Sequence, residues 1–139
     1  MKKAVLILVS LYFVVSCNQK ITKNDISKIN GYWEIEKVLL PNGDKKVYKV
    51  NESIDFFEIK NNKGFRKKVF PQFNGKYLVN DVKENITITD SSGIFFINYS
   101  TDYSKWKEQI VTLKDSTLVL KNDAKATYHF KKYKSFSLK

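Results

Sequence analysis

Apolar and polar residues alternate along most of the chain from Gly31 onward, and turn-forming residues interrupt the alternation about every 8–12 positions. Residues 85–89 show the pattern plainly, with Ile86 and Ile88 on one side and threonines on the other. A period of two residues is typical of a β-strand with one buried face. The expected strands cover residues 32–40, 46–50, 54–60, 65–70, 76–80, 85–89, 94–99, 105–113, 117–121 and 126–133.

Short turns join these strands in sequence, which favours antiparallel hairpins. Asn42-Gly43 and the segment around Gly93 carry residues that tolerate positive φ. A meander leaves exposed edges, and closure into a barrel removes them. A sandwich would need a longer crossover, and no segment of the chain offers one. The sequence therefore predicts an all-β fold, an antiparallel up-and-down β-barrel of about eight or nine strands.

The first 17 residues have a different pattern. Two lysines, Lys2 and Lys3, precede an apolar run over residues 4–15, which ends in Val15-Ser16-Cys17. The run is shorter than the ~20 residues of a membrane-spanning helix and has the length of a signal h-region. The segment resembles a bacterial lipoprotein signal, which implies that Cys17 becomes the acylated N-terminus. An ordinary signal with a chance cysteine is the alternative. Cys17 has no cysteine partner, so a disulfide scaffold is excluded.

The expected organisation follows from this reading. Residues 1–16 form a signal peptide, residues 17–28 the lipidated cysteine and a tether, residues 29–134 the barrel, and residues 135–139 a tail. A tether of that length spans roughly 18 Å as a coil, which keeps the barrel near the membrane. Asn18 after the cysteine favours the outer membrane of the cell envelope over the inner one.

The chain is strongly basic. Its formal charge is +11 at pH 7, and removal of Lys2 and Lys3 leaves +9. Such a charge favours anionic partners such as lipid headgroups or acidic polysaccharide. The basic residues are spread along the chain without a nucleic-acid-binding motif, so nucleic acid is not an expected partner. General abundance of lysine is the alternative explanation.

Three short motifs stand out in the strand region. They are the Gly-x-Trp of Gly31 and Trp33, the Thr-Asp-Tyr of Thr101, Asp102 and Tyr103, and a basic residue near the last strand, Lys131 or Lys132. Together they resemble the motifs of lipocalins, in particular small bacterial lipocalin-like lipoproteins. The resemblance implies a barrel that holds one small ligand. Trp33 is expected to plug the floor of that barrel.

We expect aromatic and aliphatic residues of the strands to line the ligand site. The candidates are Phe57, Phe65, Phe95, Ile97, Tyr99 and Tyr128. Such an apolar lining suits a hydrophobic or lipid-like ligand. In the alternative interpretation these side chains fill the core, and the protein is an interaction module that uses its basic outer surface.

Catalytic chemistry finds no support in the sequence. His129 is the sole histidine and is expected to point outward from its strand. Clusters of Cys and His that would bind a metal are missing, as is a nucleophile-elbow motif. The carboxylates, Asp55 and Glu84 among them, have the spacing of ordinary surface residues. We therefore expect a binding protein with no cofactor and no metal, and the oligomeric state stays open.

Overall fold

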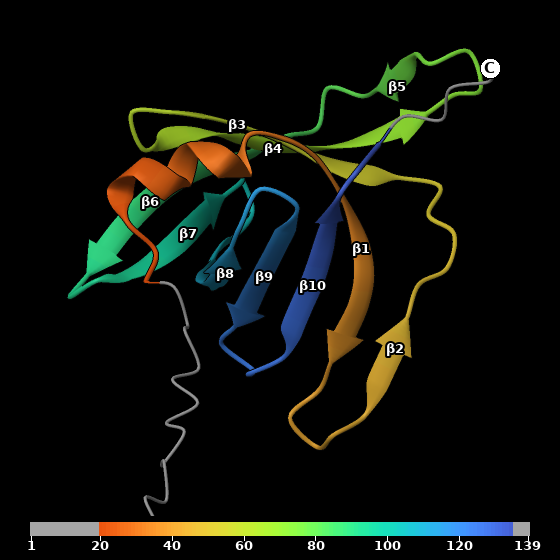
Figure 1. Cartoon of the computed structure of the whole chain (residues 1–139). Coiled ribbons are helices and arrows are strands. Elements are labelled where there is room, and N and C mark those ends of the chain that lie inside the picture. Colours follow the sequence, from red (N-terminus) through yellow and green to blue (C-terminus); the bar gives the residue numbers. More distant parts are fainter. Residues whose placement is uncertain (1–19, 135–139) are drawn as a thin grey trace, which may run out of the picture.

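In the computed structural model, which describes residues 20–134, eight antiparallel strands pair side by side until the last meets the first (Figure 1). The strands of this ring are β1 (Gly31–Leu39), β3 (Ile54–Lys60), β4 (Lys63–Pro71), β6 (Glu84–Ser91), β7 (Ile94–Ser100), β8 (Lys105–Leu113), β9 (Thr117–Asn122) and β10 (Thr127–Lys132). Two short strands, β2 (Lys45–Val47) and β5 (Tyr77–Val79), pair outside it with β1 and β4. The predicted antiparallel barrel is confirmed.

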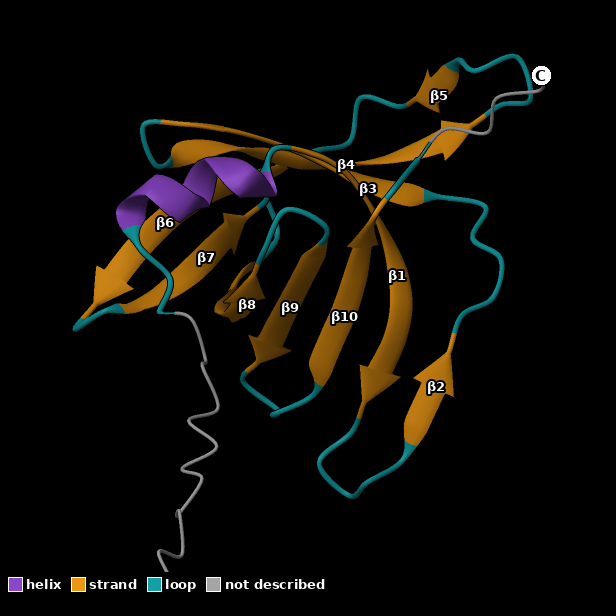
Figure 2. Ribbon diagram, viewed as in Figure 1, coloured by secondary structure: helices purple, strands orange, loops and turns teal. Residues whose placement is uncertain are grey.

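Strand β1 determines how the barrel closes and where it opens. Along one edge it pairs with β10 over its length, from Trp33 opposite Lys132 to Leu39 opposite Thr127. On its other edge only Gly31–Trp33 pairs with β3, while its last residues pair with β2. The sheet is therefore continuous at the end where β1 begins. At the other end β2 diverges from the ring, as Figure 2 shows.

A 3-10 helix, η1 (Lys23–Ile29), covers the end of the barrel where β1 begins (Figure 2). It starts after Thr22, whose backbone N–H donates to Asp25 Oδ2 over 2.8 Å. Its apolar residues Ile26 and Ile29 are buried in the core, and Ile21 packs against the same core. The expectation that the tether extends to residue 28 is therefore wrong, because residues from Ile21 onward belong to the domain.

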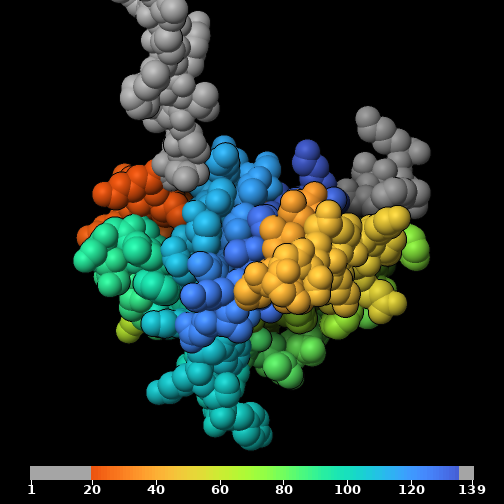
Figure 3. All heavy atoms as spheres, turned by 90° about the horizontal axis from the view of Figure 1, so that it is seen from below, coloured from red at the N-terminus to blue at the C-terminus, as the bar shows by residue number. Residues whose placement is uncertain are grey.

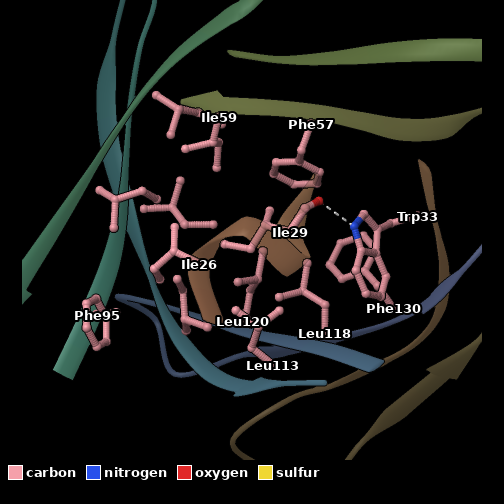
Figure 4. Packing of buried hydrophobic residues seen from close by; sticks show 14 of the residues in the cluster. Ile26, Ile29, Trp33, Phe57, Ile59, Phe95, Leu113, Leu118, Leu120 and Phe130 are labelled. Carbon is pink, nitrogen blue, oxygen red and sulfur yellow. Dashed lines mark hydrogen bonds between the residues drawn. The ribbon is translucent and has the colours of Figure 1, made fainter. Parts of the chain in front are cut away.

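The hydrophobic core lies between this helix and the middle of the barrel. Alternate residues of each strand point inward, so single strands supply side chains such as Phe57 and Ile59, or Leu118 and Leu120 (Figure 4). Trp33, Phe57, Ile97 and Leu118 are fully buried there. Within residues 20–134, no helix has both the length and the apolar character required to cross a membrane.

Candidate functional site

The floor of the barrel is built around Trp33. Its indole Nε1 donates a hydrogen bond to the carbonyl of Ile29 over 2.7 Å, which links β1 to η1 (Figure 4). The Lys132 ammonium lies 4.5 Å from the centre of the indole ring and donates to Asn30 O over 2.6 Å. Gly31 leaves room for that lysine, since a Cβ on Gly31 would stand 2.9 Å from its Nζ. Lys132, rather than Lys131, is thus the basic residue that packs on the motif tryptophan.

The segment Thr101-Asp102-Tyr103 does not join this floor. It connects β7 to β8 at the opposite end of the barrel, and the Tyr103 side chain is 96% exposed. The Thr101 hydroxyl accepts backbone N–H bonds from Tyr103 and Ser104, so the threonine shapes its own turn. The loop that does reach the floor joins β8 to β9, where Ser116 O accepts the backbone N–H of Lys132. The three motif segments therefore do not meet at one place.

Above the floor lies a cavity of about 640 Å³, at the end where β2 diverges. In Figure 3 this end faces the viewer, with the β1–β2 segment in yellow-orange, β9 and β10 in blue, and the β7–β8 loop projecting in teal. The residues that line the cavity are Ile35, Val38, Tyr48, Val50, Asn51, Glu52, Ser53, Asp55, Arg66, Lys68, Trp106, Glu108, Asn122, Tyr128 and Phe130. The lining is therefore mixed, with apolar residues on one side and charged residues on the other.

Arg66 is the centre of the charged side. It points inward from β4, donates from Nε to Glu84 over 2.8 Å, and donates to the Tyr99 hydroxyl over 3.3 Å. Glu108 lies 3.6 Å away on β8. Burial disfavours the charged form of Arg66, but Tyr99 and the surrounding carboxylates raise its pKa above the usual value. Arg66 therefore stays charged with its donors engaged.

The carboxylates of this wall were expected on the surface, and that expectation is wrong for two of them. Asp55 points inward from β3, and its side chain is only 5% exposed, with the Lys68 ammonium 2.7 Å from Oδ1. Glu84 is half-buried against Arg66. A third carboxylate, Glu108, is buried, and burial raises its pKa while the Tyr99 hydroxyl and Arg66 act in the opposite direction. Charged residues thus share the barrel interior with apolar ones.

The apolar side of the cavity comes from β1, β8 and β10. Ile35, Trp106, Tyr128 and Phe130 form most of it, and the Trp106 ring stacks on Tyr99 with 5.3 Å between ring centres. Tyr128 accepts a hydrogen bond from the Asn122 side chain over 3.3 Å, which holds its ring in the wall. This side can take the apolar body of a small molecule.

Of the six residues expected to line a ligand site, Tyr128 alone borders this cavity. Phe57, Phe95 and Ile97 lie in the buried core, and Tyr99 packs behind Arg66 and Trp106. Most of the residues predicted to line the ligand site therefore belong to the core, and one belongs to the cavity wall.

The inward position expected for Phe65 is wrong. Its neighbour Arg66 faces the interior, so the alternation of β4 turns Phe65 outward. There its ring centre lies 6.0 Å from that of Phe56, with Lys67 and Lys83 close to its face.

His129 lies on the outer side of β10. Its Nε2 is 3.3 Å from the Thr127 hydroxyl, and burial together with Lys37 lowers the pKa of its imidazole. Across residues 20–134 no group of three His, Cys, Asp or Glu side chains is arranged to hold a metal ion. The cavity is therefore the feature of the described chain best suited to hold a small molecule.

Comparison with known proteins agrees with this architecture. A family model for the lipocalin-like domain matches residues 29–120. No curated protein matches the chain.

Solved structures with a similar fold include a lipocalin-like protein from Bacteroides uniformis ATCC 8492, with 12% identity, a TM-score of 0.48, and coverage of 76% of this chain and 99% of that one. An uncharacterized protein from Bacteroides eggerthii DSM 20697 is 15% identical with a TM-score of 0.47, over 75% and 98% of the two chains. Apocrustacyanin C1 is 10% identical with a TM-score of 0.47, over 84% and 67%.

Proposed function

Because this chain belongs to the lipocalin-like domain family, we propose that it binds a small hydrophobic or lipid-like molecule in the cavity of its barrel, at a membrane to which Cys17 anchors it. The observation that carries the proposal is the cavity of about 640 Å³ above the Trp33 floor. Pockets for small molecules have volumes of roughly 300–1,000 Å³, and this cavity lies in that range with a mixed lining of apolar and charged residues. The role is binding, without catalysis.

The apolar wall supports a ligand with a hydrocarbon body. Trp106, Tyr128 and Phe130 line the cavity, and Ile35 and Val38 line it from β1. Burial of apolar surface contributes about 25 cal/mol per Å². A ligand that covers this wall would gain most of its affinity from it.

The membrane anchor is supported by the sequence. Cys17 lies outside the described residues, and the signal-like pattern before it is the basis for its proposed acylation. A single acyl chain gives only marginal membrane binding, whereas several chains hold a protein durably. Only Asn18, Gln19 and Lys20 separate Cys17 from Ile21, which packs on the core. We therefore place the barrel at the surface of the envelope membrane, with the outer membrane favoured.

The domain that begins at residue 18 is suited to the binding test, because residues 20–134 contain the closed ring and the core. We expect decanol to quench or shift the fluorescence of Trp106 in a saturable manner. The variant Ile35→Trp should narrow the cavity at its apolar wall and weaken the binding of decanol, as measured by calorimetry. Leu40→Trp is the control, because Leu40 is exposed and does not line the cavity. Failure of decanol and related amphiphiles to bind the wild-type domain would refute the proposal.

Metabolic labelling tests the anchor separately. Cells that express the full chain and receive labelled palmitate should incorporate the label, and Cys17→Ser should not. A chain that stays unlabelled and is released from membranes by salt would show that no anchor forms.

A second candidate function is binding of anionic envelope material by a basic surface. It is favoured by three exposed lysines on or near β2, Lys45, Lys46 and Lys49, beside the cavity mouth. Exposed charges act within about 8 Å at physiological ionic strength. Sedimentation of the domain with anionic phosphatidylglycerol vesicles should therefore weaken with added salt and with replacement of the three lysines by glutamine. Binding that ignores both changes would exclude this function.

A further inference from the structure

One buried carboxylate in the cavity wall, that of Asp55, has a single close donor among the described residues. This donor is the Lys68 ammonium, which lies 2.7 Å from Oδ1 as an ion-pair partner. A carboxylate offers about four acceptor positions, and Asp55 Oδ1 is shielded from solvent. Buried carboxylate oxygens usually accept hydrogen bonds, since a missing bond leaves the desolvation of the group uncompensated. Asp55 therefore has accepting capacity that the protein itself leaves unused.

Asp55 is also placed where a ligand can reach it. It borders the cavity from β3, and across from it lies the apolar wall of Trp106, Tyr128 and Phe130. Its close partner, the Lys68 side chain, is 58% exposed. In contrast, Arg66 already donates through Nε to Glu84 and through Nη1 to Tyr99. Asp55 is thus a buried charged group of the wall whose close partner is one exposed lysine.

Carboxylates outnumber cations around Asp55. Lys68 lies against Asp55, and Arg66 lies against Glu84 and Glu108. Glu52, at the mouth of the cavity, is exposed to water. An anionic ligand would meet this excess of carboxylates, and a cationic ligand would lose its hydration on entry and compete with Lys68 for Asp55. A neutral donor avoids this cost and still forms a strong hydrogen bond, because the acceptor is ionised.

We propose that the ligand is an uncharged amphipathic molecule whose hydroxyl group donates a hydrogen bond to Asp55 while its apolar body lies on Trp106, Tyr128 and Phe130. This inference rests on the proposed function, because it assigns the polar end of the molecule that occupies the cavity. Lys68 stays beside Asp55 as its counter-ion, and the hydroxyl takes one of the remaining acceptor positions of the carboxylate. Asp55 then selects for a donor at one end of the ligand, and the wall selects for an apolar body.

Three matched probes test this assignment by isothermal titration of the domain that begins at residue 18. They are decanol, decyl methyl ether, which lacks the donor, and decylamine, which is cationic at neutral pH. We expect decanol to bind roughly tenfold or more tightly than the ether, as a hydrogen bond to a charged group implies. We also expect decanol to bind more tightly than decylamine.

Variants of the ion pair then identify the acceptor. Asp55→Leu should reduce the decanol-to-ether affinity ratio to about one, and Asp55→Asn, which keeps a neutral acceptor, should give a smaller preference than the wild type. Lys68→Met should retain the preference, because it removes the counter-ion of Asp55 and leaves the acceptor in place. The affinity ratio cancels effects of a variant on cavity size, and Asp55→Asn supplies the test if the leucine variant does not fold.

Each other outcome overturns a defined part of the inference. Equal binding of decanol and the ether by the wild type would overturn the role of Asp55 and leave the cavity function intact. Saturable binding of none of the probes would refute the cavity function as well. Tighter binding of decylamine would overturn the uncharged class, and a preference lost only in Lys68→Met would assign the polar contact to Lys68.

Discussion

Two neighbouring lysines on β10 show how burial separates residues of the same kind. Lys132 turns toward the floor, where its ammonium contacts both the Asn30 carbonyl and the Trp33 ring. Lys131 points to the other side, is 53% exposed, and lies 3.6 Å from Glu34. Burial lowers the pKa of Lys132, with Asp115 acting in the opposite direction. Lys132 is therefore a structural residue, and Lys131 is a surface residue.

We expect Lys132→Met to lower the free energy of unfolding by about 1–2 kcal/mol, because the Asn30 carbonyl loses its donor and the indole loses its cation. The matched control Lys131→Met should cost less than about 1 kcal/mol, as exposed ion pairs contribute little. Urea denaturation followed by circular dichroism measures both. Equal losses in the two variants would contradict the structural role of Lys132.

The buried carboxyl of Glu108 should make stability depend on pH. Its pKa in the folded protein is raised by burial, so the protonated form is favoured relative to the unfolded chain. Its contribution to stability is thus fully present below the unfolded pKa and is lost as the pH rises through the folded pKa. Glu108→Gln should remove this pH dependence. The free energy of unfolding of the variant should therefore rise relative to that of the wild type from acid to neutral pH. Denaturation at a series of pH values measures the difference in unfolding free energy between the two proteins. A difference that does not change with pH would contradict the raised pKa of Glu108.

At the level of the strands, Gly64 on β4 permits a close approach to the backbone of β3. It lies opposite Ile59 on β3 and Ile86 on β6. A Cβ at this position would stand 1.7 Å from the backbone oxygen of Glu58, which cannot move without breaking the β3–β4 pairing. The glycine therefore lets the strands cross closely where the sheet bends round the floor.

Gly64→Ala should consequently destabilise the barrel by more than about 2 kcal/mol, since backbone atoms rather than a side chain must shift. Gly43→Ala is the control: it lies in an open turn at φ +90°, with no atom near the added methyl group. Its cost should be limited to about 1–2 kcal/mol of backbone strain. Thermal unfolding compares the loss of stability in the two variants. A loss in Gly64→Ala no larger than that in Gly43→Ala would refute the close approach of the strands.

On the scale of the whole molecule, the barrel divides into a packed floor and an open cavity. The floor holds the fully buried side chains, including Trp33, Ile97 and Leu118. The cavity borders a largely different set, to which Ile35 and Tyr128 belong, and Phe130 is shared by the two. Stability and binding are therefore expected to depend on different residues of the same barrel.

A bound ligand should stabilise the fold by mass action, by about 2.7 kcal/mol at a concentration of 100 times its dissociation constant. We expect Leu118→Ala to lower stability by about 2–5 kcal/mol and to keep this increment with decanol, because Leu118 is a core residue that does not line the cavity. Ile35→Trp should reduce the increment. Thermal shift with and without decanol measures both, and loss of the increment in Leu118→Ala would show that the two regions are coupled.

The strands and the floor could be predicted because local patterns specify them. Alternation located the strands to within a few residues, and Gly31-x-Trp33 indicated the floor. The cavity wall could not be predicted in this way. Alternation states that Phe65 and Arg66 face opposite sides of β4, but not which of them faces inward. Hydrophobicity alone favours Phe65, whereas the pairing of Arg66 with Glu84 and Glu108 offsets its burial.

The sequence by itself determined the all-β class, the antiparallel order of the strands, the family, and the tryptophan at the floor, because these depend on residues close together in the chain. Only the tertiary structure decided which residues meet around the cavity. Asp55, Arg66 and Glu108 come from β3, β4 and β8, so no local pattern relates them. Thr101 lies far from the floor for the same reason, since closure of the barrel places each loop at one end or the other. Charges that are separated in the chain become neighbours only when the ring closes, and those charges give the cavity its polar side.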